Sequence, residues 1–156
     1  MTYSIQGLSA DRFAPLFALN DTELAAINAR RVTATADMGF PCRISLQDAR
    51  AGEELILLHH ISHDVATPYR SAYAIYVRSG VDAASYRDEL PPVFAGRPIA
   101  LRAFDAAGML QTARLAGPGE ADAAIRDLFA DAGIAYIDAH NAAHGCFAAR
   151  IERDGA

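Results

Sequence analysis

The chain has only two cysteines and five histidines, and all seven fall in three short windows. In chain order, the windows contain Cys42; His59, His60 and His63; and His140, His144 and Cys146. Thiols and imidazoles supply many of the nucleophiles, bases and metal ligands of proteins. We therefore expect any chemistry of this chain to draw on these windows, although no stretch matches a catalytic motif of known mechanism.

A thiol and an imidazole together suggest nucleophilic catalysis, with Cys42 or Cys146 as the nucleophile and His140 as the base. Asp138 precedes His140 by two residues, so a strand would place both on one face. The carboxylate could then orient the imidazole. The alternative is that Asp138 and Asn141 form turn hydrogen bonds and that His140 caps a hairpin.

Arg43 adjoins Cys42 and would favour a reactive thiolate if its charge reached the sulfur. Neighbouring side chains on a strand face opposite ways, so this contact requires the strand to break at Cys42. The alternative is that the cysteines pack as small apolar side chains, as most buried free cysteines do.

Arginines near the windows suggest an anion site. Arg43, Arg70 and Arg78 could converge on a carboxylate or phosphate, which suits the planar guanidinium. Arg70 follows Tyr69 in a proline-containing turn, which would present both side chains. The alternative is that the arginines pair with nearby carboxylates, namely Asp48, Glu53 or Asp64.

Metal binding is the less favoured interpretation of the histidines. His59 and His63 lie four residues apart, but on an extended strand they would be about 13 Å apart. Neither Cys-x-x-Cys nor His-Glu-x-x-His occurs. We therefore assign no metal ligands and name no cofactor. The chain also lacks lysine, which excludes Schiff-base catalysis, pyridoxal phosphate anchoring and a phosphate-loop lysine.

Composition limits the protein class. The 156 residues fit one domain, spanning 1–156, with a core that needs no disulfide. The net charge of -5 argues against a nucleic-acid partner. No apolar run approaches the ~20 residues that cross a bilayer, and the N-terminus does not resemble a signal peptide. We expect a cytoplasmic protein with reduced thiols.

Local patterns predict an α+β fold. Alternating or continuous apolar segments predict about seven strands, mostly linked as hairpins, so the sheet should be largely antiparallel. Two or three helices are expected to pack on this sheet, the clearest of them over 119–132. Another helix is expected to begin near Asn20. Apolar and polar residues alternate from Cys42 to Leu46, which is typical of a half-buried strand. The nine segments with such patterns, from which these strands are drawn, lie near 3–8, 31–36, 42–46, 54–60, 71–78, 99–104, 109–115, 134–140 and 146–152.

Several of these segments together resemble the signature of a family of small bacterial proteins, domain of unknown function 1203. The segments are Gly39–Ala49 with Gly52 and Glu53, Thr67–Arg70, Ile75–Arg78, Tyr136–Asn141 and Gly145–Arg150. The resemblance spans nearly the whole chain. It implies that Cys42, Arg43, Tyr69, Arg70, Asp138, His140, Asn141 and Cys146 lie in the signature stretches, and it carries over no activity, substrate or cofactor.

The leading hypothesis is a pocket that binds a small polar or anionic ligand. We expect Cys42, Arg43, Arg70 and His140 to line it, with Arg43 and Arg70 as anion contacts and His140 as acid or base. Tyr69, Asp138 and Asn141 complete the expected ligand-binding set. The second hypothesis is a small cysteine- and histidine-dependent enzyme, and the third is a non-catalytic homodimeric interaction module.

Overall fold

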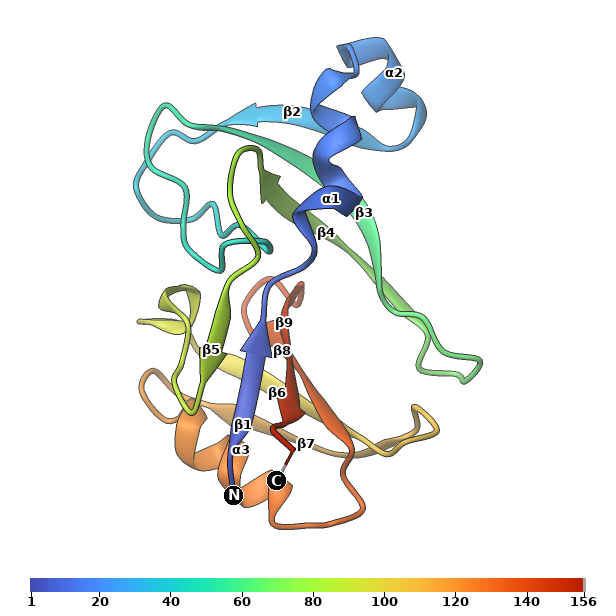
Figure 1. Ribbon diagram of the computed structural model, residues 1–156, viewed down its shortest axis with the longest axis vertical. Helices are drawn as coiled ribbons and strands as arrows, with labels where there is room; N and C mark the ends of the chain where they lie inside the picture. Colours follow the sequence, from blue (N-terminus) through green and yellow to red (C-terminus); the bar gives the residue numbers. More distant parts are fainter. Residues whose placement is uncertain (156) are drawn as a thin grey trace.

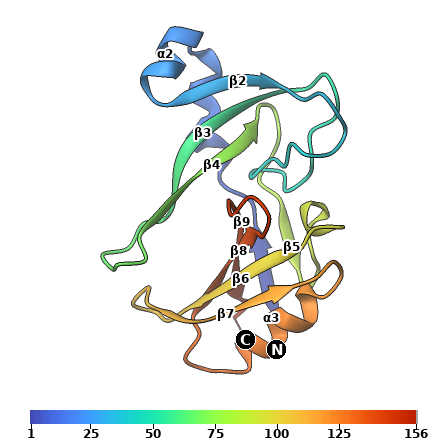
Figure 2. The same cartoon turned by 180° about the vertical axis from the view of Figure 1, so that it is seen from behind.

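The computed structural model describes residues 1–155 as an α+β fold built on two antiparallel sheets (Figure 1). The larger sheet has six strands in the order β5-β1-β9-β8-β6-β7, and the smaller has three in the order β2-β3-β4. The sequence predicted the α+β class and the antiparallel pairing, but it predicted one sheet of about seven strands. The nine strands instead divide between two sheets that lie one above the other in Figures 1 and 2.

The strands follow the predicted apolar segments closely. The larger sheet contains β1 (Tyr3–Gln6), β5 (Ser85–Arg87), β6 (Ile99–Phe104), β7 (Leu110–Ala116), β8 (Tyr136–Asn141) and β9 (Phe147–Arg153). The smaller sheet contains β2 (Ala29–Thr33), β3 (Glu54–His63) and β4 (Ser71–Arg78). The three-residue β5 pairs with β1 and was not predicted, because so short a segment gives no periodic signal.

Short helices cover the outer surfaces of the sheets. The α-helices are α1 (Ala10–Phe13), α2 (Asp21–Ala26) and α3 (Ala121–Phe129), and the 3₁₀ turns are η1 (Ala14–Ala18) and η2 (Pro92–Phe94). Asn20 and Glu23 form a capping box that begins α2, as the sequence predicted. Helix α3 packs its apolar face on the larger sheet (Figure 2). No helix within residues 1–155 is long and apolar enough to span a membrane.

The two larger of three apolar clusters lie on either side of the boundary between the sheets. One contains α3 and the inward residues of the larger sheet, including Ile125, Leu101 and Ile151. The other joins the smaller sheet to α1 and α2, with Ile56 and Ile75 fully buried. Polar side chains are buried between these cores, and the candidate site lies there.

The segment Cys42–Leu46 is a turn, not the strand that its alternating pattern predicted. Leu46 donates its backbone N–H to the Cys42 carbonyl, and Leu46 has a φ of +53°, which no strand residue adopts. Cys42 contributes only an isolated bridge to Tyr76 of β4. The alternation of apolar and polar residues did not indicate a half-buried strand here, because the polar residues Arg43 and Ser45 are buried together with the apolar ones.

This turn is anchored by the backbone on both sides. The Arg43 N–H donates to the Tyr76 carbonyl, and the Arg43 carbonyl accepts from the Leu8 N–H. Next to Leu8, a Cβ on Gly7 would lie 1.8 Å from the carbonyl oxygen of Ile44. Only glycine permits this close approach, so the chain leaving β1 fixes where Arg43 sits between the sheets.

Candidate functional site

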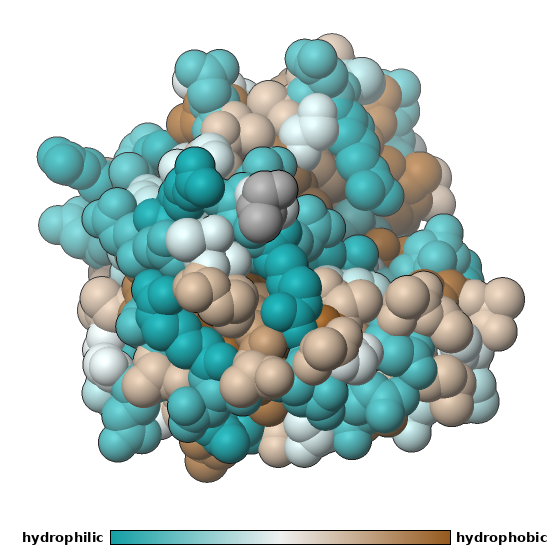
Figure 3. Space-filling view, turned by 60° about the horizontal axis from the view of Figure 1, so that its bottom comes forward, coloured by the Kyte–Doolittle hydropathy of each residue, from teal (hydrophilic) through white to brown (hydrophobic). Residues whose placement is uncertain are grey.

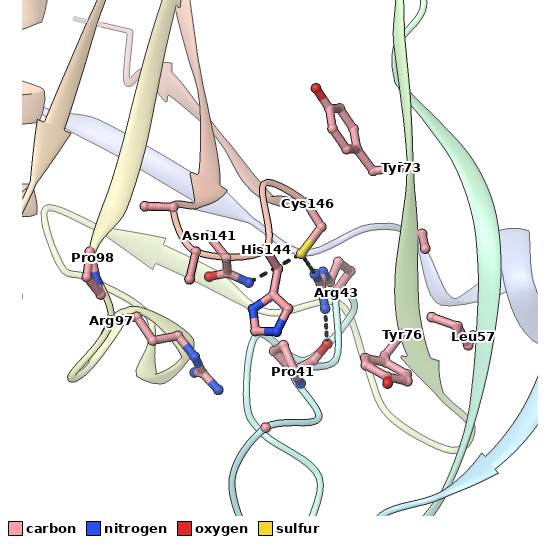
Figure 4. A pocket seen from close by; sticks show the side chains of 14 residues that line it. Pro41, Arg43, Leu57, Tyr73, Tyr76, Arg97, Pro98, Asn141, His144 and Cys146 are labelled. Carbon is pink, nitrogen blue, oxygen red and sulfur yellow. Dashed lines mark hydrogen bonds between the residues drawn. The ribbon is translucent and has the colours of Figure 1, made fainter.

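A cavity of about 510 Å³ lies between the two sheets (Figure 4). Four segments form it: the turn at Pro41–Arg43, the paired strands β3 and β4, the residues just before β6, and the loop between β8 and β9. The lining residues are Gly39, Pro41, Arg43, Leu57, Tyr73, Ala74, Tyr76, Arg97, Pro98, Asn141, Ala142, Ala143, His144 and Cys146. The turn that contains Cys42 and the loop that contains His144 and Cys146 therefore both border the cavity, whereas Cys42 itself and the histidines of the second window do not line it.

Arg43 is the buried cation of this cavity, with 2% of its surface exposed. Its Nε donates to the Phe147 carbonyl at 2.9 Å and its Nη1 donates to the Pro41 carbonyl. Its Nη2 lies 3.1 Å from the sulfur of Cys146. None of the carboxylates in residues 1–155 forms an ion pair with it.

Burial lowers the pKa of Arg43 below its usual value, because desolvation disfavours the charged form. The sulfur atoms of Cys146 and Cys42 act in the opposite direction, and the nearby charge of Arg97 lowers the pKa further. Arginine is so basic that Arg43 nevertheless remains a cation near neutral pH. A further negative charge beside it would therefore be stabilising.

Cys146 receives two N–H donors from different parts of the fold. Besides Arg43, the side-chain Nδ2 of Asn141 donates to its sulfur at 3.7 Å. Asn141 ends β8, and a tight loop returns the chain to β9, with the Gly145 N–H donating to the Asn141 carbonyl at 2.7 Å. Gly145 has a φ of +78°, a conformation that glycine adopts without strain. The loop thus holds sulfur and amide side by side (Figure 4).

Asn141 also carries a polar atom that has no partner. Only 9% of the Asn141 surface is exposed, and its side-chain Oδ1 accepts no hydrogen bond within residues 1–155. Buried acceptors are normally satisfied, so this oxygen favours a group that brings an O–H or N–H to it.

Arg97 is the second guanidinium on the cavity wall. It forms a paired contact with Asp48, with Nη2–Oδ1 and Nη1–Oδ2 distances of 2.7 and 2.9 Å. The guanidiniums of Arg43 and Arg97 therefore both line the cavity, and the Asp48 carboxylate neutralises that of Arg97. Sequence reasoning missed Arg97 because it lies in the irregular Pro- and Gly-rich connector, where no periodic pattern singles out a residue.

His140 is buried beside the cavity instead of lining it. Its Nδ1 donates to the Gly145 carbonyl at 2.9 Å, and its ring packs edge-on against Tyr73. Burial lowers the pKa of His140 because it disfavours the charged ring, and the hydrogen bond to Gly145 partly opposes this effect. This arrangement matches the hairpin-capping alternative for His140, whereas His144 is the exposed histidine on the cavity wall.

Asp138 does not orient His140. Its carboxylate, with 1% of the side chain exposed, accepts from Arg150 Nε at 2.8 Å and Nη2 at 3.1 Å. The Arg150 guanidinium also lies over the Tyr136 ring. Tyr136 in turn donates its hydroxyl to His63 Nε2 at 2.7 Å. The expected carboxylate–imidazole pair is thus replaced by a structural ion pair on the inner face of β8 and β9.

Three of the other predicted residues lie away from the cavity lining. Cys42 is completely buried in the apolar core of the smaller sheet. Tyr69 and Arg70 lie at the exposed tip of the β3–β4 hairpin, and Arg70 Nε pairs with Asp64 Oδ1 at 2.9 Å. That pairing is one of the alternatives that the sequence left open. Of the predicted set, Arg43, Asn141 and Cys146 line the cavity together.

A family model matches residues 39–153 of this chain, about three quarters of its length. Its description reads "Protein of unknown function (DUF1203)". The chain belongs to this family. The match confirms the resemblance drawn from the sequence segments. No curated protein and no solved structure matches the chain.

Every residue that lines the cavity falls inside the DUF1203 match, whereas α1, α2 and β2 precede it. The family region thus contains the complete cavity lining. Within residues 1–155, no three His, Cys, Asp or Glu side chains gather closely enough to hold a metal ion. The polar side chains that line the cavity carry guanidinium, thiol, amide, imidazole and, at Tyr73 and Tyr76, phenol groups.

Proposed function

We propose that the protein binds a small organic anion in the cavity between its two sheets. The observation that supports this proposal most strongly is the charge of the lining: Arg43 and Arg97 face the cavity, and Asp48 neutralises only Arg97. A carboxylate or phosphate on a ligand would supply the missing negative charge. Planar guanidiniums recognise both groups well.

The remaining lining suggests the shape of the ligand. Leu57, Tyr73 and Tyr76 form a mainly apolar wall on one side of Arg43, and Pro98 lies beside Arg97 on the other side (Figure 4). Small-molecule sites typically combine apolar walls with a few placed polar groups, and their volumes of about 300–1,000 Å³ include this one. We therefore expect an acid with a small aliphatic or aromatic body to bind better than an inorganic anion.

The sequence hypothesis of an anion site is kept here with different residues. Arg97 takes the place of Arg70 as the second guanidinium, and His144 takes the place of His140 as the histidine at the cavity. We further propose a cytoplasmic location, because Cys42 and Cys146 are both free thiols and that compartment keeps thiols reduced.

A homodimeric module is less well supported by the visible surface. On the face shown in Figure 3, hydrophilic residues cover much of the area and apolar residues appear between them. Broad apolar areas are what a stable dimer interface usually needs. Ligand binding takes precedence as the proposed function because the cavity offers a specific site, with Arg43 and Arg97 in its lining.

Titration of the protein with acetate, benzoate, 3-phenylpropionate and inorganic phosphate, followed by heteronuclear NMR, tests the proposal. We expect shifts centred on Arg43, Arg97 and Asn141, with affinity increasing from acetate to 3-phenylpropionate. Arg97→Gln should weaken binding at least about tenfold, the cost of one charge-assisted contact. The matched control is Arg70→Gln, because Arg70 is exposed and remote from the lining.

Two outcomes would overturn the proposal. One is the absence of cavity shifts with every probe at millimolar concentration. The other is an equal loss of affinity in Arg97→Gln and Arg70→Gln, which would indicate diffuse attraction of anions to arginines in place of a specific site.

A further inference from the structure

The cavity wall holds a sulfur atom in surroundings that differ from those of an inert thiol. Cys146 is partly exposed, and two N–H donors, Arg43 Nη2 and Asn141 Nδ2, converge on its sulfur. Donors and cations beside a sulfur stabilise negative charge on it, which is the general condition for a reactive cysteine. Among residues 1–155, the donating guanidinium has no carboxylate partner that competes for its charge.

Cys42 provides a contrast within the same chain. It is fully buried in the apolar core of the smaller sheet, against residues such as Ile44 and Ile75. It does not line the cavity, so reagents that enter the cavity reach one sulfur and not the other. The fold therefore distinguishes the two thiols by access as well as by charge.

Asn141 supplies the second indication of a site at Cys146. Its Oδ1 is a buried acceptor that no donor within residues 1–155 contacts, on the same amide whose Nδ2 contacts the sulfur. A hydroxyl placed on the sulfur would bring an O–H donor next to this amide. The amide donates to the sulfur through Nδ2, and its Oδ1, on the far side of the amide from the sulfur in Figure 4, is left to accept from another group.

We propose that Cys146 is a site of reversible oxidation by hydroperoxides. The sulfur attacks one peroxide oxygen, so that an S–O bond forms while the O–O bond breaks. The sulfur loses two electrons and becomes a sulfenic acid, and the peroxide is reduced to water or an alcohol after the departing oxygen takes a proton from solvent. Arg43 stabilises the negative charge that passes between sulfur and oxygen in this step.

Recovery of the thiol requires a reductant from outside the chain. Cys42 is enclosed in its core, so an internal disulfide would require the fold to open. A small thiol in the cavity can instead attack the sulfenic sulfur, which forms a mixed disulfide and releases water. A second thiol then releases Cys146 as the free thiol and leaves with the first as a disulfide.

Oxidation of the reduced wild-type protein with hydrogen peroxide in the presence of dimedone tests this proposal. Dimedone traps sulfenic acid, and peptide mass spectrometry assigns the label. We expect label on Cys146 and none on Cys42 in the folded protein. The rate for Cys146 should exceed that of the same residue in the urea-unfolded chain by at least about tenfold, because the donors from Arg43 and Asn141 stabilise the charge that develops in the reaction.

Variants separate the role of the surroundings from access alone. Asn141→Ala should slow labelling several-fold without unfolding the protein, which circular dichroism checks. Gln111→Ala, an exposed amide on β7, is the matched control and should leave the rate unchanged. Millimolar small thiol should restore the reduced mass of the wild-type protein when dimedone is left out.

A Cys146 rate no higher than that of the unfolded chain overturns the proposal, as does preferential labelling of Cys42. Equal rates in Asn141→Ala and wild type overturn the assigned role of the amide. The proposal is independent of anion binding, because oxidation is measured without added anion and anion binding can be measured on Cys146→Ser. Either can fail while the other holds.

Discussion

The Nη2 atom of Arg43 lies 3.1 Å from the sulfur of Cys146, although 103 positions separate the two residues in the chain. Arg43 belongs to the turn beside the smaller sheet, and Cys146 belongs to the loop that enters β9 of the larger sheet. The same guanidinium also donates to the Phe147 carbonyl. One side chain thus ties the two sheets together at the cavity that they enclose.

This arrangement predicts a large effect of Arg43→Met on stability. The substitution removes the donors to the Pro41 and Phe147 carbonyls as well as the contact to Cys146. Buried acceptors left without donors cost about 1–3 kcal/mol each, so the free energy of unfolding should fall by about 2–4 kcal/mol. Urea denaturation followed by circular dichroism measures the change.

The control for this prediction is Arg114→Met. Arg114 is exposed on β7 and pairs with exposed Asp127, so its loss should change stability by less than about 1 kcal/mol. Arg43→Lys should fall between the two, because one ammonium keeps the charge but cannot span three acceptors. Equal stability of Arg43→Met and Arg114→Met would show that Arg43 does not join the sheets.

The ion pair between Asp138 and Arg150 predicts unequal effects of its two halves. Arg150→Met would leave a carboxylate that is 1% exposed without a cation, which should cost about 3–5 kcal/mol. Asp138→Asn should cost less, because the Arg150 side chain is 35% exposed and water can solvate its charge. Urea denaturation of both variants tests the order, and a larger loss in Asp138→Asn would contradict the account.

His60 predicts how stability depends on pH. Burial lowers its pKa in the folded protein to about 4, with the charges of Arg12, His59 and Arg43 acting in the same direction. The unfolded chain, with a histidine pKa near 6.5, therefore binds the proton more readily. The contribution of His60 is fully present above about pH 6.5 and is lost as the pH falls toward 4, by about 1–3 kcal/mol.

Thermal or urea unfolding between pH 4 and 7 measures this dependence. His60→Leu should reduce the slope, because leucine suits the apolar contacts with Phe13 and Phe147 and takes up no proton. A residual slope of the same sign is expected from His140, whose pKa burial also lowers. His59→Gln should reduce the slope only slightly, because it removes one of the charges that lower the pKa of His60. An unchanged slope in His60→Leu would contradict the assignment.

Local patterns in the sequence predicted most of the elements. The strand Ile99–Phe104 and the strand Ser71–Arg78 have the predicted bounds, and the capping box at Asn20 begins α2. Helix α3 lies within the predicted range, although it is shorter at both ends. These features depend on periodicity and capping over a few residues, which a single sequence displays directly.

Features that depend on distant contacts were predicted poorly. The division into two sheets depends on pairings between β1 and β9 and between β6 and β8, whose partners are far apart in the chain. Arg43 was expected on a strand, yet it lies in a turn because backbone groups of Leu8 and Tyr76 hold it. Arg97 gave no signal, since its role depends on where Asp48 lies in the fold.

The most direct test of the central claim is the alkylation rate of Cys146 by iodoacetamide with and without 3-phenylpropionate. Iodoacetamide is neutral, so an added anion can slow it only by occupying the cavity or changing the charge around the sulfur. The account predicts one reactive thiol in the folded protein, at Cys146, and saturable protection that is stronger with 3-phenylpropionate than with acetate. Reaction of Cys42 at a similar rate, or a Cys146 rate that no organic anion changes, would contradict it.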